Sequence, residues 1–165
     1  MESSQQTSKS YFKIFSIIHM SLVLCVVLFG LVVCFFIADF QQTDTQSRFA
    51  DLFIYLVPGL VMIGIIASNV IFRIRLNAIN KTADIKTKMS VYRESSLIRF
   101  MLIITPALFA LVAIIATNNI NFLVYAGLMI VSLIVKRPNP ERAVADLNLN
   151  QQERAILENP DSIVL

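Results

Sequence analysis

Polar side chains inside otherwise apolar stretches are the first candidates for chemistry in this sequence, because an unpaired polar group is costly to bury in an apolar environment. These candidate polar and hinge residues are His19, Ser68, Asn69, Thr105 and Pro106. His19 is the only histidine, and no Cys, Asp or Glu lies three or four positions from it to complete a metal site. We interpret it as an interfacial anchor that reaches headgroups or water, with a proton relay or ligand as the alternative.

The other candidates have structural interpretations. Ser68 and Asn69 precede Arg73 and Arg75 by about one turn, which predicts a polar collar beneath two snorkelling arginines. Pro106 follows Thr105 and leaves the carbonyl of the residue four positions earlier without its helical partner. We therefore expect a kink, which in transporters sometimes forms a hinge.

No set of residues has the spacing of a catalytic or cofactor site. The chain has four glycines, no glycine-rich phosphate loop and no zinc-binding or redox motif. Cys25 and Cys34 are nine positions apart and cannot pair within one straight helix, so we expect two free, apolar thiols. The sequence therefore predicts no catalytic residue, no cofactor and no metal; a lipid-directed enzyme using His19 is the least favoured alternative.

The composition indicates what must position these residues. The chain is 56% hydrophobic and 15% charged, against about 45–50% and about 25% in soluble domains. The apolar residues form four blocks, which predict membrane spans at about 14–38, 52–72, 97–117 and 120–135. The last two blocks are short and need their polar flanks to extend the helices, so two spans with a re-entrant hairpin are an alternative. The expected fold is an all-α, four-transmembrane-helix bundle at 14–135, with cytosolic tails at 1–13 and 136–165.

The basic residues predict the orientation. Thirteen of the 14 fall in the two tails and the second connection, leaving Arg48 alone in the first connection. Because Lys and Arg beside a span stay in the cytosol, both termini are expected there, in a bacterial inner membrane, with the first span uncleaved. The basic residues that we expect to contact lipid headgroups at the cytosolic face are Arg73, Arg75, Arg99, Lys136 and Arg137. Insertion and contact with anionic lipid explain the net charge of +3, with no nucleic acid.

An internal repeat and small residues predict how the spans pack. At an offset of 80, seven identities fall in the 21 positions from Ser16 to Phe36, which indicates two tandem hairpins. Small residues let helices approach closely in lipid. The predicted packing residues are Gly64 and Ser68 on the second span and Ala107, Ala110, Ala113 and Ala116 on the third.

The carboxyl tail carries two helix signals. Pro140 can open a short helix through Leu147, and Asn150 with Glu153 predicts a capping box for another that ends near Glu158. Apolar side chains could dock this tail, and a frayed tail is the alternative. Upstream, Asp84 and Lys88 form a predicted i,i+4 pair at the start of the third helix.

Two families share features with this chain. The duplicated hairpin resembles the proteolipid subunits of rotary ATPases in plan, but the mid-membrane carboxylate that those subunits need is absent from all four spans. The whole chain, over most of 14–150, looks like a group of small four-span bacterial membrane proteins. The shared features are Ile17-Ile18-His19, Leu97-Ile98-Arg99-Phe100 leading to Pro106-Ala107-Leu108-Phe109, and Lys136-Arg137-Pro138. This resemblance implies a membrane location and no particular activity.

Three functions stay open at this point. We expect a non-catalytic packing or accessory subunit of a larger inner-membrane assembly, with the bilayer and either a membrane protein or further copies of the chain as partners. A small oligomeric transporter or channel is the alternative, although four-span multidrug exporters usually carry a mid-membrane glutamate that is absent here. An enzyme ranks third.

Overall fold

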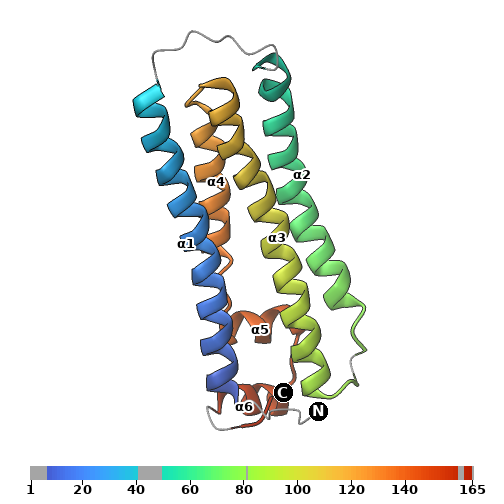
Figure 1. The fold of residues 1–165 in the computed structure, drawn as a ribbon. Coiled ribbons are helices and arrows are strands. Elements are labelled where there is room, and N and C mark those ends of the chain that lie inside the picture. The colour runs from blue at the N-terminus through green and yellow to red at the C-terminus, as the bar shows by residue number, and fades with distance from the viewer. Residues whose placement is uncertain (1–6, 41–49, 81, 160–161, 165) are drawn as a thin grey trace, which may run out of the picture. The chain divides into compact units, whose positions relative to one another are not determined.

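The computed structural model describes residues 7–40, 50–80, 82–159 and 162–164. In this part of the chain six helices follow one another: α1 (Ser8–Phe40), α2 (Ala50–Asn77), α3 (Ile85–Thr117), α4 (Phe122–Val135), α5 (Pro140–Leu147) and α6 (Gln151–Glu158) (Figure 1). Apart from one isolated bridge between Thr7 and Ile163, the described residues contain no strand, which confirms the all-helical prediction. Arg48 lies outside the described residues.

Three helices are long and apolar enough to cross a bilayer, namely α1, α2 and α3. A fourth span is reached only if α4 and α5 are counted together. The 14 residues of α4 extend about 21 Å, whereas the hydrocarbon core is about 30 Å thick. The third span was predicted at 97–117, and α3 ends at Thr117 as expected. Asn118 adopts a left-handed conformation (φ 53°), and the chain turns until α4 begins at Phe122, two residues after the predicted start at position 120.

The described helices belong to two compact units. The first consists of Met1–Met20, Asn69–Arg99 and Arg137–Leu165, and the second of Ser21–Ser68 and Phe100–Lys136. Each of α1, α2 and α3 therefore contributes residues to both units, while α4 belongs to the second and α5 and α6 to the first.

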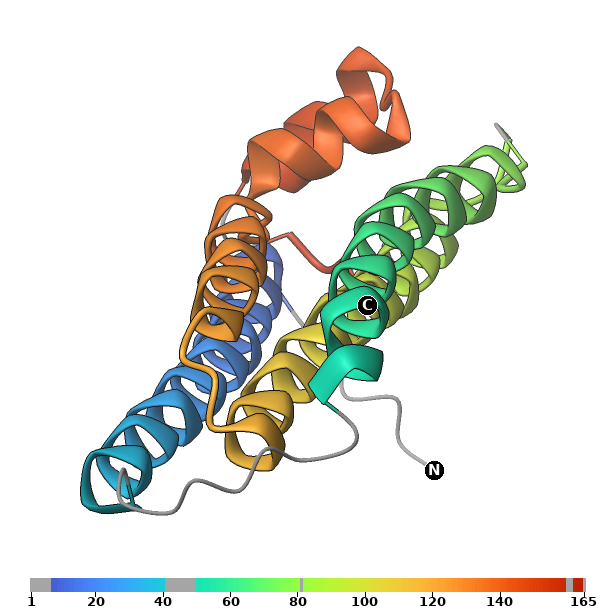
Figure 2. The same ribbon diagram turned by 90° about the horizontal axis from the view of Figure 1, so that it is seen from above.

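In the second unit, α2 lies beside α3 and α1 beside α4 (Figure 2). The predicted alanine ridge on α3 is buried at Ala107, Ala110 and Ala113, but Ala116 is exposed. Three residues turn a helix through about 300°, so each step falls about 60° short of a full turn and Ala116 lies about 180° from Ala107. The ridge therefore leaves the buried side before its last member.

A close helix contact of the second unit joins Gly64 on α2 to Pro106 on α3. A Cβ atom added to Gly64 would lie 2.6 Å from Pro106 Cγ and 2.9 Å from the Leu102 carbonyl oxygen. That carbonyl is the one whose helical partner Pro106 lacks. Pro106 lies inside α3, which continues on both sides of it. Glycine is needed at position 64 because a Cβ atom there would collide with α3.

Aromatic side chains form the centre of the first unit. Tyr11 and Phe15 of α1 pack on each other, Phe15 meets Tyr92 of α3 at 6.5 Å, and Phe72 of α2 meets Tyr92 at 6.0 Å between ring centroids. The Tyr11 hydroxyl donates a hydrogen bond of 3.0 Å to the Met89 carbonyl oxygen. The two contacts with Tyr92 are edge-to-face and join α1 and α2 to α3 within this unit.

The carboxyl tail is docked in the first unit rather than frayed. Both tail helices have the predicted bounds, and the capping box between Asn150 and Glu153 is formed in both directions. Leu157 is buried, and its carbonyl oxygen accepts a hydrogen bond of 2.6 Å from Ser8 Oγ. The Ser8 amide donates to the Ser162 carbonyl oxygen at 2.9 Å, so the start of α1 binds the end of the chain.

An ion pair also holds the tail. Lys88 Nζ lies 2.6 Å from Glu153 Oε1, and the two side chains are only 7% and 16% exposed. The predicted pair between Asp84 and Lys88 is not formed, since the Asp84 carboxylate instead accepts a hydrogen bond from the Ile85 amide. A carboxylate brought from 65 positions away therefore replaces the local one.

This pair makes tail docking sensitive to acid. Burial acts to raise the pKa of Glu153, but hydrogen bonds from Lys88 and from the Asn150 amide, with the charge of Lys88, lower it below its ordinary 4.5. The docked carboxylate holds its proton less tightly than the undocked one, so docking is stabilised above pH 4.5 and loses this stabilisation as the pH falls below that value. We expect the amide NMR signals of α6 to shift towards undocked positions between pH 5.5 and about 3.5.

Glu153→Gln is the control for that titration. Its α6 signals are expected to report weaker docking at pH 5.5 and little further change on acidification. An acid transition of wild-type size in this variant would assign the pH dependence to another carboxylate.

Candidate functional site

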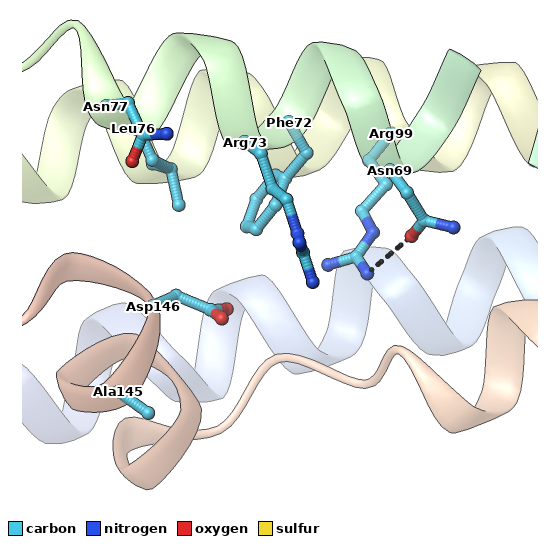
Figure 3. Close-up of a pocket in the computed structure, with 8 residues that line it drawn as sticks. All are labelled: Asn69, Phe72, Arg73, Leu76, Asn77, Arg99, Ala145 and Asp146. Atoms are coloured by element: carbon cyan, nitrogen blue, oxygen red, sulfur yellow. Dashed lines mark hydrogen bonds between the residues drawn. The ribbon is translucent and has the colours of Figure 1, made fainter. Parts of the chain in front are cut away.

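A cavity of about 350 Å³ in the first unit gathers charged and amide side chains from three helices (Figure 3). Its lining comprises Asn69, Phe72, Arg73, Leu76 and Asn77 of α2, Arg99 of α3, and Ala145 and Asp146 of α5. The volume falls in the range of about 300–1,000 Å³ that is usual for ligand pockets. We take this cavity as the candidate functional site because charged and amide side chains from three helices meet in it.

Arg99 is fixed in this cavity by two contacts with α2. One guanidinium nitrogen, Nη2, donates a hydrogen bond of 3.1 Å to Asn69 Oδ1, and the guanidinium carbon lies 4.4 Å from the centroid of the Phe72 ring. Phe72 is buried, so the ring is a rigid platform for the cation. Among the described residues the buried Nε of Arg99 has no hydrogen-bond partner. The sequence predicted Arg99 only as a residue of the cytosolic face, and its contacts with Asn69 and Phe72 come from the structure.

Arg73 and Asp146 face the same space. Figure 3 shows the Arg73 and Arg99 side chains projecting together into the cavity, with the Asp146 carboxylate pointing into it from α5. Within the described part of the chain, the ion pairs do not include one between Asp146 and either arginine. Burial raises the pKa of Asp146, and the charges of Arg99, Arg142 and Arg73 only partly oppose this. The two guanidiniums are thus not neutralised by direct contact with the carboxylate.

The remaining polar candidates do not line this cavity. Ser68 is fully buried and donates to the Ile65 carbonyl oxygen at 2.9 Å, while Thr105 is exposed and donates to the Met101 carbonyl oxygen at 2.9 Å. His19 is only 2% exposed, which differs from the expected imidazole reaching headgroups or water. The hydroxyls of Ser68 and Thr105 each hydrogen-bond to a carbonyl of their own helix, so these contacts are structural.

The structure therefore brings Arg99 of α3 to Asn69 and Arg73, which the sequence had placed about one turn apart on the second span. Sequence reasoning missed Asp146, although it lies four positions after Arg142 on a charged helix. The four-residue spacing of Arg142 and Asp146 places both on one face of α5. Only the tertiary structure shows that α5 packs with this carboxylate towards Arg73 and Arg99.

The lining carries side chains of the kinds that recognise anions. Two arginines supply planar donors suited to carboxylate or phosphate, and two asparagines add amide groups. Among the described residues no group of three His, Cys, Asp or Glu side chains is placed to hold a metal ion.

Comparison with known proteins adds no relative: no family model, no curated protein and no solved structure matches this chain.

Proposed function

We propose that this chain is a non-catalytic integral membrane protein of four spans, with both termini in the cytosol, that serves as an accessory subunit of a larger inner-membrane assembly. The observation that carries the proposal is the combination of long apolar helices with large apolar side chains exposed along them. On α1 alone, the residues at least half exposed are Ile17, Met20, Leu24, Leu28, Leu31, Val32 and Phe35. Complete burial of such a side chain is worth about 1.5–3 kcal/mol, and these side chains keep half or more of their area exposed, so contact with lipid is favoured over contact with water.

Small residues on outward-facing positions support a packing role. Gly59 on α2 is exposed, with no atom within 4 Å of the Cβ that a substitution would add, and Ala116 on α3 is exposed too. In lipid, small residues mark surfaces where another helix can approach closely. Tyr55, four positions before Gly59 and 80% exposed, lies on the same face of α2. This face is the one we assign to a partner helix.

A packing role is favoured over a pore within one chain. Among the described residues of the second unit, the only buried polar side chain is Ser68, and its hydroxyl is bonded inside α2. A solute pathway needs polar groups aimed at an interior space. A pore inside a single chain therefore gains no support from these residues, and the alternative of an oligomeric transporter, whose pore would lie between copies, stays a separate hypothesis.

Two measurements test the proposal. A fluorescent protein that matures only in the cytosol should be fluorescent when fused to either the amino or the carboxyl end. A non-fluorescent fusion at either end would contradict the topology. Extraction in native nanodiscs followed by native mass spectrometry should show a second chain or further copies at a fixed ratio. Gly59→Leu should reduce that ratio, whereas Ile66→Leu, an exposed apolar exchange on the same helix, should not. A particle that is monomeric and lacks any partner would overturn the accessory role.

A further inference from the structure

We propose that the cavity lined by Arg73, Arg99 and Asp146 binds a phosphate group, with the two arginines as its ligands and Asp146 as the charge that competes with it. This goes beyond the accessory role, because it assigns a ligand to a site inside this chain. It does not require a protein partner.

The first support is the preorganisation of Arg99. Its guanidinium is held between the Phe72 ring and the Asn69 amide, so little rotamer freedom is lost when an anion binds. Only Nη2 is used by Asn69, and a planar guanidinium carries further N–H donors that suit paired phosphate oxygens. The geometry is that of an arginine positioned in advance for an oxyanion.

The second support is the balance of charge in the lining. Two arginines face one aspartate, and no ion pair joins them within the described part of the chain. One positive charge therefore remains over, which a phosphodiester with its single negative charge would neutralise. Asn77 and Asn69 line the same space and can donate from their side-chain amides.

The other described cavities of the first unit have no excess of positive charge in their lining. The one that includes Lys88 also includes Glu153, which already pairs with that lysine at 2.6 Å. The one beside Lys9 is lined by Glu141 and Glu158 as well, so its lining is acidic on balance. Only the cavity with Arg73 and Arg99 presents guanidiniums without a paired carboxylate among these three.

Two sources could supply the phosphate, namely the headgroup of a phospholipid and a soluble phosphate ester. Arg73 follows the apolar run of α2 directly, and Arg99 precedes the apolar run of α3 that begins at Phe100. Arginines in such positions lie at headgroup depth when the helices span a bilayer. Both sources would use the same two guanidiniums, so the experiment carries an arm for each.

The test uses the full-length chain, delipidated in mild detergent. One arm titrates phosphatidylglycerol, with diacylglycerol as the phosphate-free lipid, and reads lipid retention by native mass spectrometry. The other arm titrates glycerol 3-phosphate and inorganic phosphate and reads binding by calorimetry. We expect saturable binding of a phosphate-bearing probe in at least one arm and none of diacylglycerol; the arm that responds identifies the source.

Three variants make the assignment specific. Arg73→Gln should weaken binding about tenfold or more, because a charge that can hydrogen-bond to the phosphate is lost, and Arg73 is exposed rather than buried in the core. Asp146→Asn should strengthen binding roughly three- to tenfold by removing the competing charge. Arg75→Gln is the matched control, since Arg75 lies on the same helix, does not line the cavity and should leave affinity unchanged.

Arg99→Gln should also abolish binding, but this change disturbs the contact with Phe72 as well. The assignment of the phosphate site therefore depends on Arg73→Gln and Asp146→Asn. Equal losses in Arg73→Gln and Arg75→Gln, weaker binding in Asp146→Asn, or no phosphate-dependent binding in either arm would overturn the site. None of these results bears on membrane insertion or on the presence of a partner, which the fusions and the nanodisc particle measure independently.

Discussion

Replacing Gly64 with alanine should destabilise the second unit by about 1–3 kcal/mol, because the new Cβ would lie 2.6 Å from Pro106 Cγ and 2.9 Å from the Leu102 carbonyl oxygen. Neither neighbour can rotate away easily, since one belongs to a proline ring inside α3 and the other to the helix backbone. The expected fall in the thermal unfolding midpoint in detergent is about 2–4 °C per kcal/mol. Circular dichroism, or a thermal-shift assay that does not use a thiol-reactive dye, would measure the fall in the midpoint.

Gly59→Ala and Gly127→Ala are the matched controls. Nothing lies within 4 Å of the Cβ that either change would add, so both should leave the midpoint unchanged or raise it slightly through the better helix propensity of alanine. Pro106→Ala should partly rescue Gly64→Ala, because it removes the Cγ atom in the closest contact. If the alanine variants of Gly59, Gly64 and Gly127 all unfolded at the same temperature, the Gly64 contact would not determine how α2 packs on α3.

Replacing Lys88 with methionine should release the carboxyl tail. Methionine fills a similar volume but leaves the Glu153 carboxylate, which is 16% exposed, without the cation 2.6 Å away. A hydrogen bond to a charged group contributes about 1.5–3 kcal/mol, so the undocked fraction of α6 should rise roughly ten- to a hundredfold. The measurement is the rate of tryptic cleavage after Arg154, a residue in the middle of α6, together with hydrogen exchange of the α6 amides.

Glu158→Gln provides the control for tail release. It breaks the ion pair between Arg154 and Glu158, in which both side chains are more than half exposed, and such pairs contribute little. Cleavage in this variant should stay within about threefold of the wild type. In the double variant Lys88→Met with Glu153→Gln, the effect should be smaller than the sum of the single effects, because neither partner is left charged and alone. Additive effects would show that the two residues act on the tail separately.

Much of the helical architecture follows from local information. Long apolar runs placed α1, α2 and α3, and Pro140, Asn150 and Glu153 set the start of each tail helix correctly, because capping and proline geometry depend only on neighbouring residues. The end of the third span at Thr117 was also predicted, and only the start of α4 differs, at Phe122 instead of position 120. Two asparagines at the edge of an apolar run can extend a helix or turn the chain, and the left-handed conformation of Asn118 places them in the turn.

The site depends on contacts that no single helix specifies. Lys88 has an acidic residue four positions before it, yet the tertiary fold supplies Glu153 instead, because the tail returns to α3 with the better-buried carboxylate. In the same way, Arg99 and Phe72 belong to different helices, and Asp146 belongs to a third. The sequence by itself determined that the chain forms long apolar helices with basic residues at their ends, since helix formation and hydropathy are local properties. Only the tertiary structure decided that two of those arginines share one cavity and that Gly64 meets Pro106, because both depend on which helix faces lie opposite each other.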